Sequence, residues 1–285
     1  MGGVFCIQSH PPQSPSSNQN AKREESAYRF SRIADQFKSI EEVQNALRKE
    51  GLENSNLIIG VDFTKSNTWT GKTSFQGRCL HDTAGPLNPY QHVLSVIGRT
   101  LEPFDDDHLI PAFGFGDVYT TDKSCFPFYP DRPCQGLQEV VDRYREIAPG
   151  IELSGPTSFA PIIDKAIEIV REARSYHILL IVADGQVTSE SETIAAIVRA
   201  SAVPLSIVLV GVGDGPWDMM QQFDDELPQR QFDNFQFTCF TDLRAKLEAG
   251  QCSPEKLDAC LALGMLMEIP EQFKAVKKLK LLSKI

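Results

Sequence analysis

The chain has 285 residues, of which 41% are hydrophobic and 23% charged, so it has room for one large α/β domain with appendages or for two small domains. Its formal net charge of −10 argues against a nucleic-acid-binding protein, because neutralising phosphates requires clustered Lys and Arg. No apolar run reaches the roughly 18 residues that a membrane-spanning helix needs.

The cysteines are scattered and odd in number. There are seven of them, and none forms a Cys-x-x-Cys pair. This spacing excludes zinc fingers, zinc ribbons and RING modules from the sequence. Because no secretory signal is present, we expect free thiols in a reducing compartment, and therefore a cytoplasmic or nuclear location.

The first 26 residues are expected to be a disordered tail, since residues 8–26 are rich in Pro, Ser, Gln and Asn. Gly2 stands where N-myristoylation requires glycine, but Cys6 replaces the favoured Ser or Thr. Acylation of Gly2 with palmitoylation of Cys6 would supply the two lipid signals that stable plasma-membrane anchoring needs. An ordinary disordered start is the alternative, and the incomplete motif favours it.

Beyond the tail, residues 27–52 have apolar side chains at spacings of three and four, which predicts a helical extension that stops at Gly51. Residues 53–250 then alternate between continuously apolar segments and amphipathic ones. The expected strands cover residues 57–61, 109–115, 177–183, 204–210 and 235–240, and the expected helices cover residues 89–101, 138–147, 159–173 and 190–200.

Strands that are apolar throughout and separated by helices indicate a sheet covered on both faces. We therefore predict an α/β fold with a doubly wound, mostly parallel central sheet flanked by helices. Right-handed crossovers then place the loops that follow the strands at one edge of the sheet. Residues 251–285 are expected to form a C-terminal helix with a lysine-rich, amphipathic end. Such an end is typical of a solvated helix face or, alternatively, of a surface that docks on anionic lipid.

Three segments with oxygen-bearing side chains converge at the predicted edge. Asp62, Thr64 and Ser66 follow the first strand directly, and alternate residues of such a loop can face one point. Thr157 stands just before a helix, and Asp184 ends the strand of residues 177–183. Taken alone, each of these residues is explained equally well by a turn or a helix cap. The presence of all three segments, each in this order after the expected element, is more specific for a binding site.

Two carboxylates and three hydroxyls form a set of hard oxygen donors without sulfur or imidazole. This set suits Mg²⁺, or Mn²⁺ and Ca²⁺ less selectively, and does not suit zinc or copper. Because most of these donors are neutral, the metal would keep much of its positive charge. One coordination position would then accept an acidic side chain of a partner protein.

These fragments carry a family resemblance. Asp-x-Thr-x-Ser, Gly-Pro-Thr and Ala-Asp-Gly resemble the metal-ion-dependent adhesion site of von Willebrand factor A domains, a Rossmann-like fold. The segments around them are similar to the copine-type A domain, and residues 217–237 resemble the plant RING domain ligase family within that group. The resemblance covers roughly residues 26–275. The segments that carry it include residues 61–67, 113–117, 153–161 and 204–215.

In that family the A domain binds proteins, and a C-terminal RING finger recruits the ubiquitin-conjugating enzyme. The resemblance thus implies a metal-dependent module for partner or substrate recognition in protein ubiquitination. This sequence contains no RING cysteines or histidines, so we expect no ligase activity from the chain alone, and a ubiquitin-conjugating enzyme as partner only if a RING is supplied elsewhere. Two further alternatives are a RING-less membrane-associated adaptor and a ligase whose RING lies outside this chain.

Overall fold

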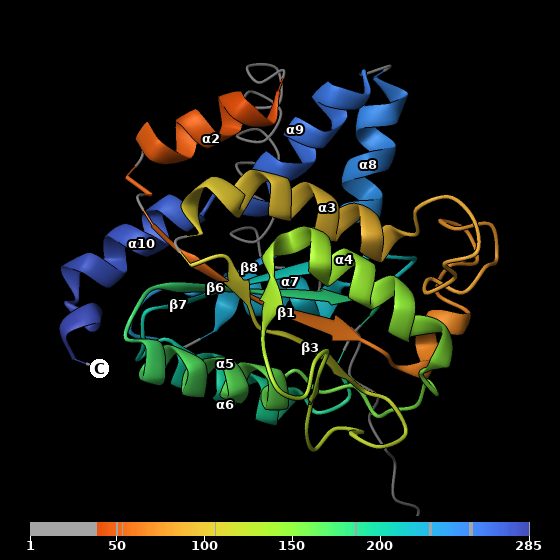
Figure 1. Ribbon diagram of the computed structural model, residues 1–285, viewed down its shortest axis with the longest axis horizontal. Coiled ribbons are helices and arrows are strands. Elements are labelled where there is room, and N and C mark those ends of the chain that lie inside the picture. Colours follow the sequence, from red (N-terminus) through yellow and green to blue (C-terminus); the bar gives the residue numbers. More distant parts are fainter. Residues whose placement is uncertain are drawn as a thin grey trace, which may run out of the picture. The chain divides into compact units, whose positions relative to one another are not determined.

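The computed structural model describes residues 39–49, 51–52, 54–105, 107–185, 187–227, 230–250 and 253–284, which all belong to one compact unit, residues 37–285 (Figure 1). The predicted tail with Gly2 and Cys6, and most of the extension predicted over residues 27–52, lie outside the described residues. The predicted domain boundaries at residues 53 and 250 stay predictions.

A six-stranded sheet runs through this unit in the order β4-β3-β1-β6-β7-β8. All neighbouring strands are parallel except β4, which pairs antiparallel with β3. The predicted doubly wound α/β fold is therefore confirmed. The strands are β1 (Asn56–Asp62), β3 (Ala112–Phe115), β4 (Phe126–Pro127), β6 (His177–Ala183), β7 (Leu205–Gly211) and β8 (Phe235–Cys239).

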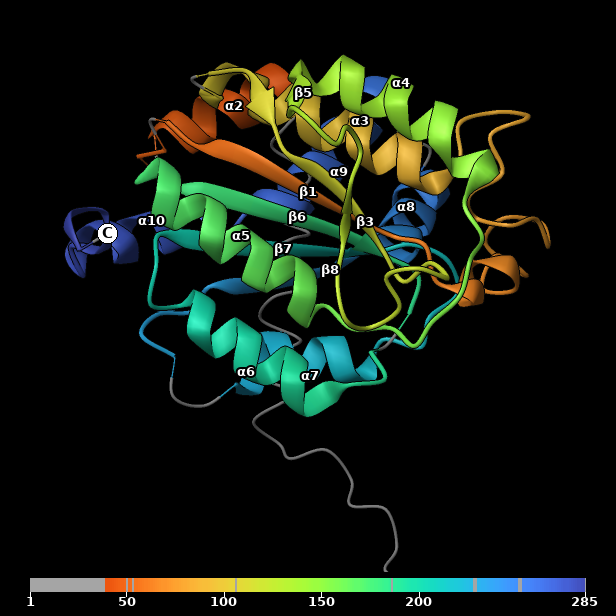
Figure 2. The same cartoon turned by 60° about the horizontal axis from the view of Figure 1, so that its bottom comes forward.

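Helices cover both faces of the sheet (Figure 2). One face carries α5 (Ala160–Ala173), α6 (Glu190–Ala200) and α7 (Asp218–Glu226). The other carries α3 (Pro89–Leu101), α4 (Gly136–Ile147), α8 (Phe240–Ala249), α9 (Pro254–Leu266) and α10 (Ile269–Lys278), with α2 (Ile40–Lys49) against α3 and α9. The short 3-10 helices are Lys65–Thr68, Glu102–Phe104, Ala148–Gly150 and Leu281–Ser283.

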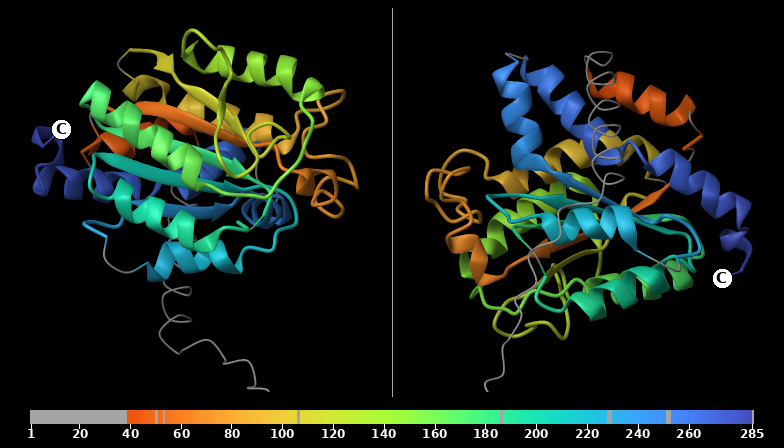
Figure 3. Two further views of the ribbon diagram at one scale, coloured as in Figure 1. Left: turned by 90° about the horizontal axis from the view of Figure 1, so that it is seen from below. Right: turned by 180° about the vertical axis from the view of Figure 1, so that it is seen from behind.

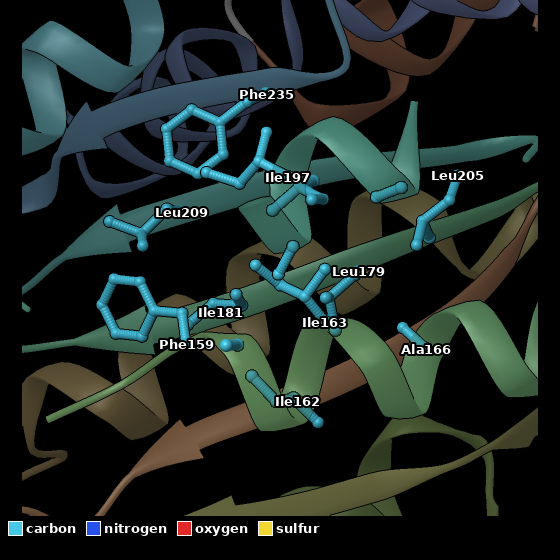
Figure 4. Close-up of a cluster of buried hydrophobic side chains, with 14 of the residues drawn as sticks. Phe159, Ile162, Ile163, Ala166, Leu179, Ile181, Ile197, Leu205, Leu209 and Phe235 are labelled. Carbon is cyan, nitrogen blue, oxygen red and sulfur yellow. The ribbon is translucent and has the colours of Figure 1, made fainter. Parts of the chain in front are cut away.

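A buried apolar cluster lies between the sheet and the helices α5, α6 and α7 (Figure 4). Leu179 and Ile181 of β6 point toward Ile162, Ile163 and Ala166 of α5, because alternate residues of a strand face the same side. Every residue of β6 is buried, as a strand covered on both faces requires. Burying each such aliphatic side chain stabilises the fold by roughly 1.5–3 kcal/mol.

The strand expected over residues 109–115 is two strands. Leu109–Ile110 forms β2, which pairs antiparallel with β5 (Cys134–Gln135), and only Ala112–Phe115 joins the central sheet as β3. Pro111 separates them. It has no N–H to donate to a ladder, although its carbonyl still accepts a hydrogen bond from the Ile59 amide at 2.9 Å.

The C-terminal segment is likewise two helices, α9 and α10, where the pattern suggested one. Pro270 cannot donate the backbone hydrogen bond that would continue α9 through this point. The apolar face of α10 packs on the fold, with the Phe273 ring centroid 4.8 Å from that of Tyr176. Because the fold uses this face, a solvated lysine face explains the basic end well. None of the described helices is both long and apolar enough to cross a bilayer.

Candidate metal centre at the carboxyl edge of the sheet

The predicted site lies where the strand order reverses. From β1 the chain passes through α3 to β3 on one side, and later through α5 to β6 on the other side of β1. In doubly wound sheets this switch point is the usual ligand site, because the loops leave it in opposite directions. Asp62 ends β1 and Asp184 directly follows β6. Both side chains are buried, so the switch point holds two carboxyl groups inside the protein.

A chain of hydrogen bonds links four of the five residues named from sequence. The Thr64 amide donates to Asp62 Oδ1 at 2.8 Å, which closes the turn after β1. The Ser66 hydroxyl donates to Asp184 Oδ1 at 2.8 Å, and it lies 2.9 Å from Thr64 Oγ1. Because Ser66 has used its only proton, Thr64 must donate in that second contact. Residues separated by more than a hundred positions thus form one cluster.

Thr157, the fifth residue named from sequence, pairs with a different segment through its backbone. Its backbone pairs with Thr188, with Thr157 N 3.2 Å from Thr188 Oγ1 and Thr188 N 2.8 Å from Thr157 O. These bonds hold the segment before α5 against the segment after β6, close in the chain to Asp184. Among the described residues, the hydrogen bonds of the cluster do not include the Thr157 hydroxyl. Its role as a metal ligand stays a prediction.

Thr70 belongs to the cluster and was missed from sequence. Its hydroxyl lies 2.5 Å from Asp184 Oδ2 and 3.0 Å from the Ser66 carbonyl oxygen. The spacing of four residues from Ser66 was the only local signal, and it predicts a helical turn rather than a site. The contact with Asp184 spans the whole β1-to-β6 crossover and has no signature in the sequence.

Asp62 carries one of the buried polar side-chain atoms that form no hydrogen bond with the described residues. Its Oδ2 is buried and has no hydrogen-bond partner among the described residues. Burial, followed by the negative charge of Asp184, raises the pKa of Asp62 well above that of an ordinary carboxyl group. Burial also raises the pKa of Asp184, although the hydroxyls of Thr70 and Ser66 oppose this. Two carboxylates held together without a cation are therefore unfavourable.

The donor set fits a hard divalent cation. The unpaired Asp62 oxygen, the Asp184 carboxylate and the hydroxyls of Thr64 and Ser66 are all oxygen ligands. No group of three or more His, Cys, Asp and Glu side chains that could hold a metal gathers anywhere in the described ranges, so this centre depends on two carboxylates and on hydroxyl oxygens. Two carboxylates balance the formal charge of a divalent cation, and the other donors are neutral hydroxyls, so a bound cation would remain a Lewis acid able to accept a further anionic oxygen.

A buried polar network below the cluster fixes the Asp62 backbone. His81 Nε2 lies 2.8 Å from the Asp62 carbonyl oxygen, and His81 Nδ1 lies 2.8 Å from the Tyr144 hydroxyl. Because the carbonyl can only accept, Nε2 carries the proton and Nδ1 accepts from Tyr144. Burial lowers the pKa of His81 to about 3, so the ring is neutral. The Tyr90 hydroxyl, which has one proton, lies 2.7 Å from Asn67 Oδ1, to which it donates, and 3.2 Å from the Asp62 carbonyl oxygen.

Neighbouring loops pack directly on the cluster. Gly116, which follows β3, has a φ of +84°, and a Cβ there would lie 2.4 Å from Thr64 Cγ2 and 3.5 Å from Asp62 Oδ1. Only glycine allows this approach. On the other side, Asp214 accepts hydrogen bonds from the amides of Thr73 at 2.7 Å and Ser74 at 2.8 Å. The loop after β1 is thereby fastened to the loop after β7.

A doubly wound sheet with Asp-x-Thr-x-Ser and Ala-Asp-Gly meeting at its switch point defines a von Willebrand factor A-type domain. A family model described as "Copine" matches residues 79–285. "E3 ubiquitin-protein ligase RGLG5" from Arabidopsis thaliana is 53% identical to this chain, over 96% of the chain and 66% of the relative. "E3 ubiquitin-protein ligase RGLG3" from the same plant is 54% identical, over 87% of this chain and 70% of that relative. This chain belongs to the copine family.

Among solved structures, "von Willebrand factor type A from Catenulispora acidiphila" is similar with a TM-score of 0.45 and 13% identity, covering 75% of this chain and 43% of that one. The chain spans 66% of the length of RGLG5 and 57% of that of "E3 ubiquitin-protein ligase RGLG1" from Arabidopsis thaliana. A substantial part of these relatives therefore has no counterpart in the chain.

Proposed function

We propose that this chain is a divalent-cation-dependent protein-binding module. One observation carries the proposal: the buried Asp62 Oδ2 has no hydrogen-bond partner among the described residues, and it belongs to a cluster with a second buried carboxyl group, Asp184. An unpaired buried polar atom costs about 1–3 kcal/mol, and more when it is charged. A bound cation removes that cost, which gives these side chains a reason to be held in the crevice.

Different residues of the cluster would have different roles in binding the cation. Asp62 and Asp184 would balance the charge of the cation, and Ser66 and Thr64 would offer hydroxyl oxygens, with Thr157 as the further predicted ligand. When bound, the cation supplies a Lewis-acidic coordination position that captures an acidic side chain of a partner protein. Mg²⁺ is the proposed ion, with Mn²⁺ and Ca²⁺ as less selective substitutes. Thr70 and His81 orient the cluster and do not need to touch the cation.

The biological role follows from the family. Relatives at 53% and 54% identity are named E3 ubiquitin-protein ligases, so we propose that the module recognises a partner or substrate in protein ubiquitination. Recruitment of a ubiquitin-conjugating enzyme would require a RING supplied elsewhere.

A cytoplasmic or nuclear location, with plasma-membrane anchoring if Gly2 and Cys6 are acylated, is part of the same proposal. Mass spectrometry of the N-terminus after expression in plant cells tests the acylation.

Thermal unfolding tests the cation site, because Asp62→Asn should change stability in opposite directions with and without metal. A carboxyl group whose pKa is raised by folding stabilises the fold only below its unfolded pKa, and at neutral pH it destabilises. We therefore expect Asp62→Asn to raise Tm in EDTA. In wild type, Mg²⁺ at a hundred times its Kd should add about 2.7 kcal/mol, or about 5–10 °C in Tm. In Asp62→Asn this increase should disappear.

Asp117→Asn is the matched control. Asp117 is also buried and lies on the neighbouring loop, but its carboxylate binds the Thr120 amide at 2.9 Å and not the cluster. This variant should keep the Mg²⁺-dependent increase in Tm. The proposal fails if Mg²⁺ and Mn²⁺ leave the wild-type Tm unchanged, or if Asp62→Asn responds to them as wild type does. Calorimetric titration with Mn²⁺ alone gives an independent value of the affinity.

A further inference from the structure

Exposed aromatic side chains flank the candidate metal centre. Trp69 is 59% exposed and Tyr119 is 89% exposed, although most large apolar side chains of the described residues are buried. Val118, next to Tyr119, is also exposed. Removing such groups from water is favourable, so exposed aromatic residues beside a polar cluster are typical of a surface that binds another molecule. We call Trp69, Val118 and Tyr119 the apolar rim.

Trp69 is held in place by the cluster itself. Its amide donates to the Ser66 carbonyl oxygen at 2.9 Å, and the next residue, Thr70, binds Asp184. The Thr70 carbonyl in turn accepts a hydrogen bond from the Asp214 amide at 2.7 Å. The backbone that carries the Trp69 ring is therefore fixed on the β6 and β7 side of Asp62.

Tyr119 is fixed on the opposite side. It stands in the turn after β3, three residues from Gly116, which packs on Thr64. Asp117 accepts hydrogen bonds from the amide and hydroxyl of Thr120 and so closes this turn. The Val118 amide also donates to the Glu152 carbonyl oxygen at 3.0 Å, which leaves the Tyr119 side chain pointing into solvent.

The strand order places the metal centre between the two aromatic residues. Tyr119 follows β3, Asp62 ends β1, and the Trp69 turn is fastened to residues after β6 and β7. Both loops lie at the same end of the sheet, as the orange and yellow-green segments show in Figures 2 and 3. Adjacent strands are about 4.8 Å apart, so β3 and β6 are separated by about 10 Å, the length of about three extended residues.

The charge at this edge matches an acidic partner. Lys65 stands between Thr64 and Ser66 in the chain, and its side chain is exposed. Its amide donates to the Ser154 carbonyl oxygen at 2.6 Å, so the backbone beneath this ammonium group is also fixed. In a chain of net charge −10, a lysine at this position favours a negatively charged ligand.

We infer that the apolar rim selects the partner: a protein segment in which one Asp or Glu is accompanied, within about three residues on each side, by an aromatic or long aliphatic residue. The acidic side chain enters the metal centre, and the apolar neighbours pack on Trp69 and Tyr119. This inference rests on the proposed function and adds the residues that determine specificity. Aromatic residues at the centre of interfaces commonly contribute most of the binding free energy.

Peptide selection tests the inference. A phage-displayed library of random peptides with a fixed central Asp is selected on the wild-type chain in Mg²⁺, and the recovered peptides are synthesised with a fluorescent label. Anisotropy then gives their Kd for wild type, Trp69→Ser and Tyr119→Ser. We expect apolar residues to be enriched on both sides of the Asp, and each substitution to weaken binding at least about tenfold. Both variants should keep the Mg²⁺-dependent increase in Tm.

Leu109→Ser is the matched control, because Leu109 is also exposed but lies on β2, before β3 and so toward the amino end of the sheet. It should bind the peptides as wild type does. The inference is overturned if the peptides have no apolar preference, if the Trp69 and Tyr119 variants bind them normally, or if no Mg²⁺-dependent peptide is recovered while Mg²⁺ still raises Tm. Loss of the Tm response in wild type would instead remove the proposed function as well.

A lipid surface is the competing occupant. Vesicles containing phosphatidylserine should not bind the chain in Mg²⁺ any better than neutral vesicles do. Preferential binding to these vesicles that is lost in Trp69→Ser would assign the apolar rim to a membrane and overturn the inference.

Discussion

Thr70 is the residue whose hydroxyl contacts the second carboxylate of the candidate metal centre, at 2.5 Å from Asp184 Oδ2. Asp184 is almost completely buried, so the loss of this hydrogen bond leaves a charged oxygen without its partner. We expect Thr70→Val to lower the free energy of unfolding by about 1–3 kcal/mol at neutral pH in EDTA.

Thr70→Ser is the control, because it keeps the hydroxyl and loses only a methyl group. Its free energy of unfolding, measured with urea, should stay closer to that of wild type. Equal stability of the valine and serine variants would show that the hydroxyl does not hold Asp184. The same two variants also test whether Thr70 positions Asp184 for metal binding. Thr70→Val should weaken Mn²⁺ binding because Asp184 is no longer held, and Thr70→Ser should bind Mn²⁺ as wild type does.

The loop after β1 is held in place by Asp214, which belongs to the loop after β7. Burial raises the pKa of the Asp214 carboxyl group, but the amides of Thr73 and Ser74 outweigh this and hold it below its usual range. Asp214→Ala should therefore release this part of the loop, and the amides of Thr73 and Ser74 should exchange with deuterium at least about tenfold faster. Hydrogen-exchange mass spectrometry measures this.

Asp214→Asn keeps one acceptor oxygen and should lose only part of the protection. If Asp214→Ala leaves the exchange of Thr73 and Ser74 unchanged, the loop is held by its own turns. The prediction matters for binding, because the same loop carries Trp69.

The whole domain should become less stable in acid through His81. Its pKa falls to about 3 because the ring is buried, whereas an unfolded histidine titrates near 6.5. Between about pH 6.5 and pH 3 the unfolded chain binds a proton that the native chain does not, so the contribution of His81 falls as pH falls, by up to about 1.4 kcal/mol per unit. The raised pKa values of Asp62 and Asp184 act in the opposite direction.

His81→Gln isolates this contribution, because its amide can still donate to the Asp62 carbonyl but does not titrate. Urea unfolding in EDTA at a series of pH values should give a shallower loss of stability toward acid in this variant. Parallel slopes for wild type and His81→Gln would mean that the imidazole is accessible to protons in the native state.

Most of the fold could be predicted from the sequence because its signals are local. The continuously apolar run of β6 and the helix of α3, which spans Pro89–Leu101 as expected, need only neighbouring residues for their interpretation. The break at Pro111 was missed because the residues around it have the same strand-like composition. Only the pairing of Leu109–Ile110 with β5, a distant segment, shows that these two residues leave the central sheet.

The candidate site was predictable to the extent that it consists of strand ends. Asp62 and Asp184 each follow a recognisable buried strand, and parallel strands bring their carboxyl ends to one edge. Thr70 and His81 come from a loop without periodicity, so nothing in the sequence indicated which buried oxygen each would meet. Whether Thr157 completes the metal centre is also a matter of side-chain orientation, which spacing does not determine.

The sequence alone thus determined the order of the main parallel strands and of the helices α3, α4, α5 and α6, the doubly wound class and the oxygen-rich residues at the carboxyl edge, because hydrophobic periodicity and strand direction are properties of short segments. The tertiary structure decided which oxygens meet, that Asp62 Oδ2 is buried without a hydrogen-bond partner in the described part of the chain, and that Trp69 and Tyr119 are exposed. The physical reason is that burial, electrostatic repulsion between carboxylates and the exposure of aromatic rings depend on contacts between segments far apart in the chain.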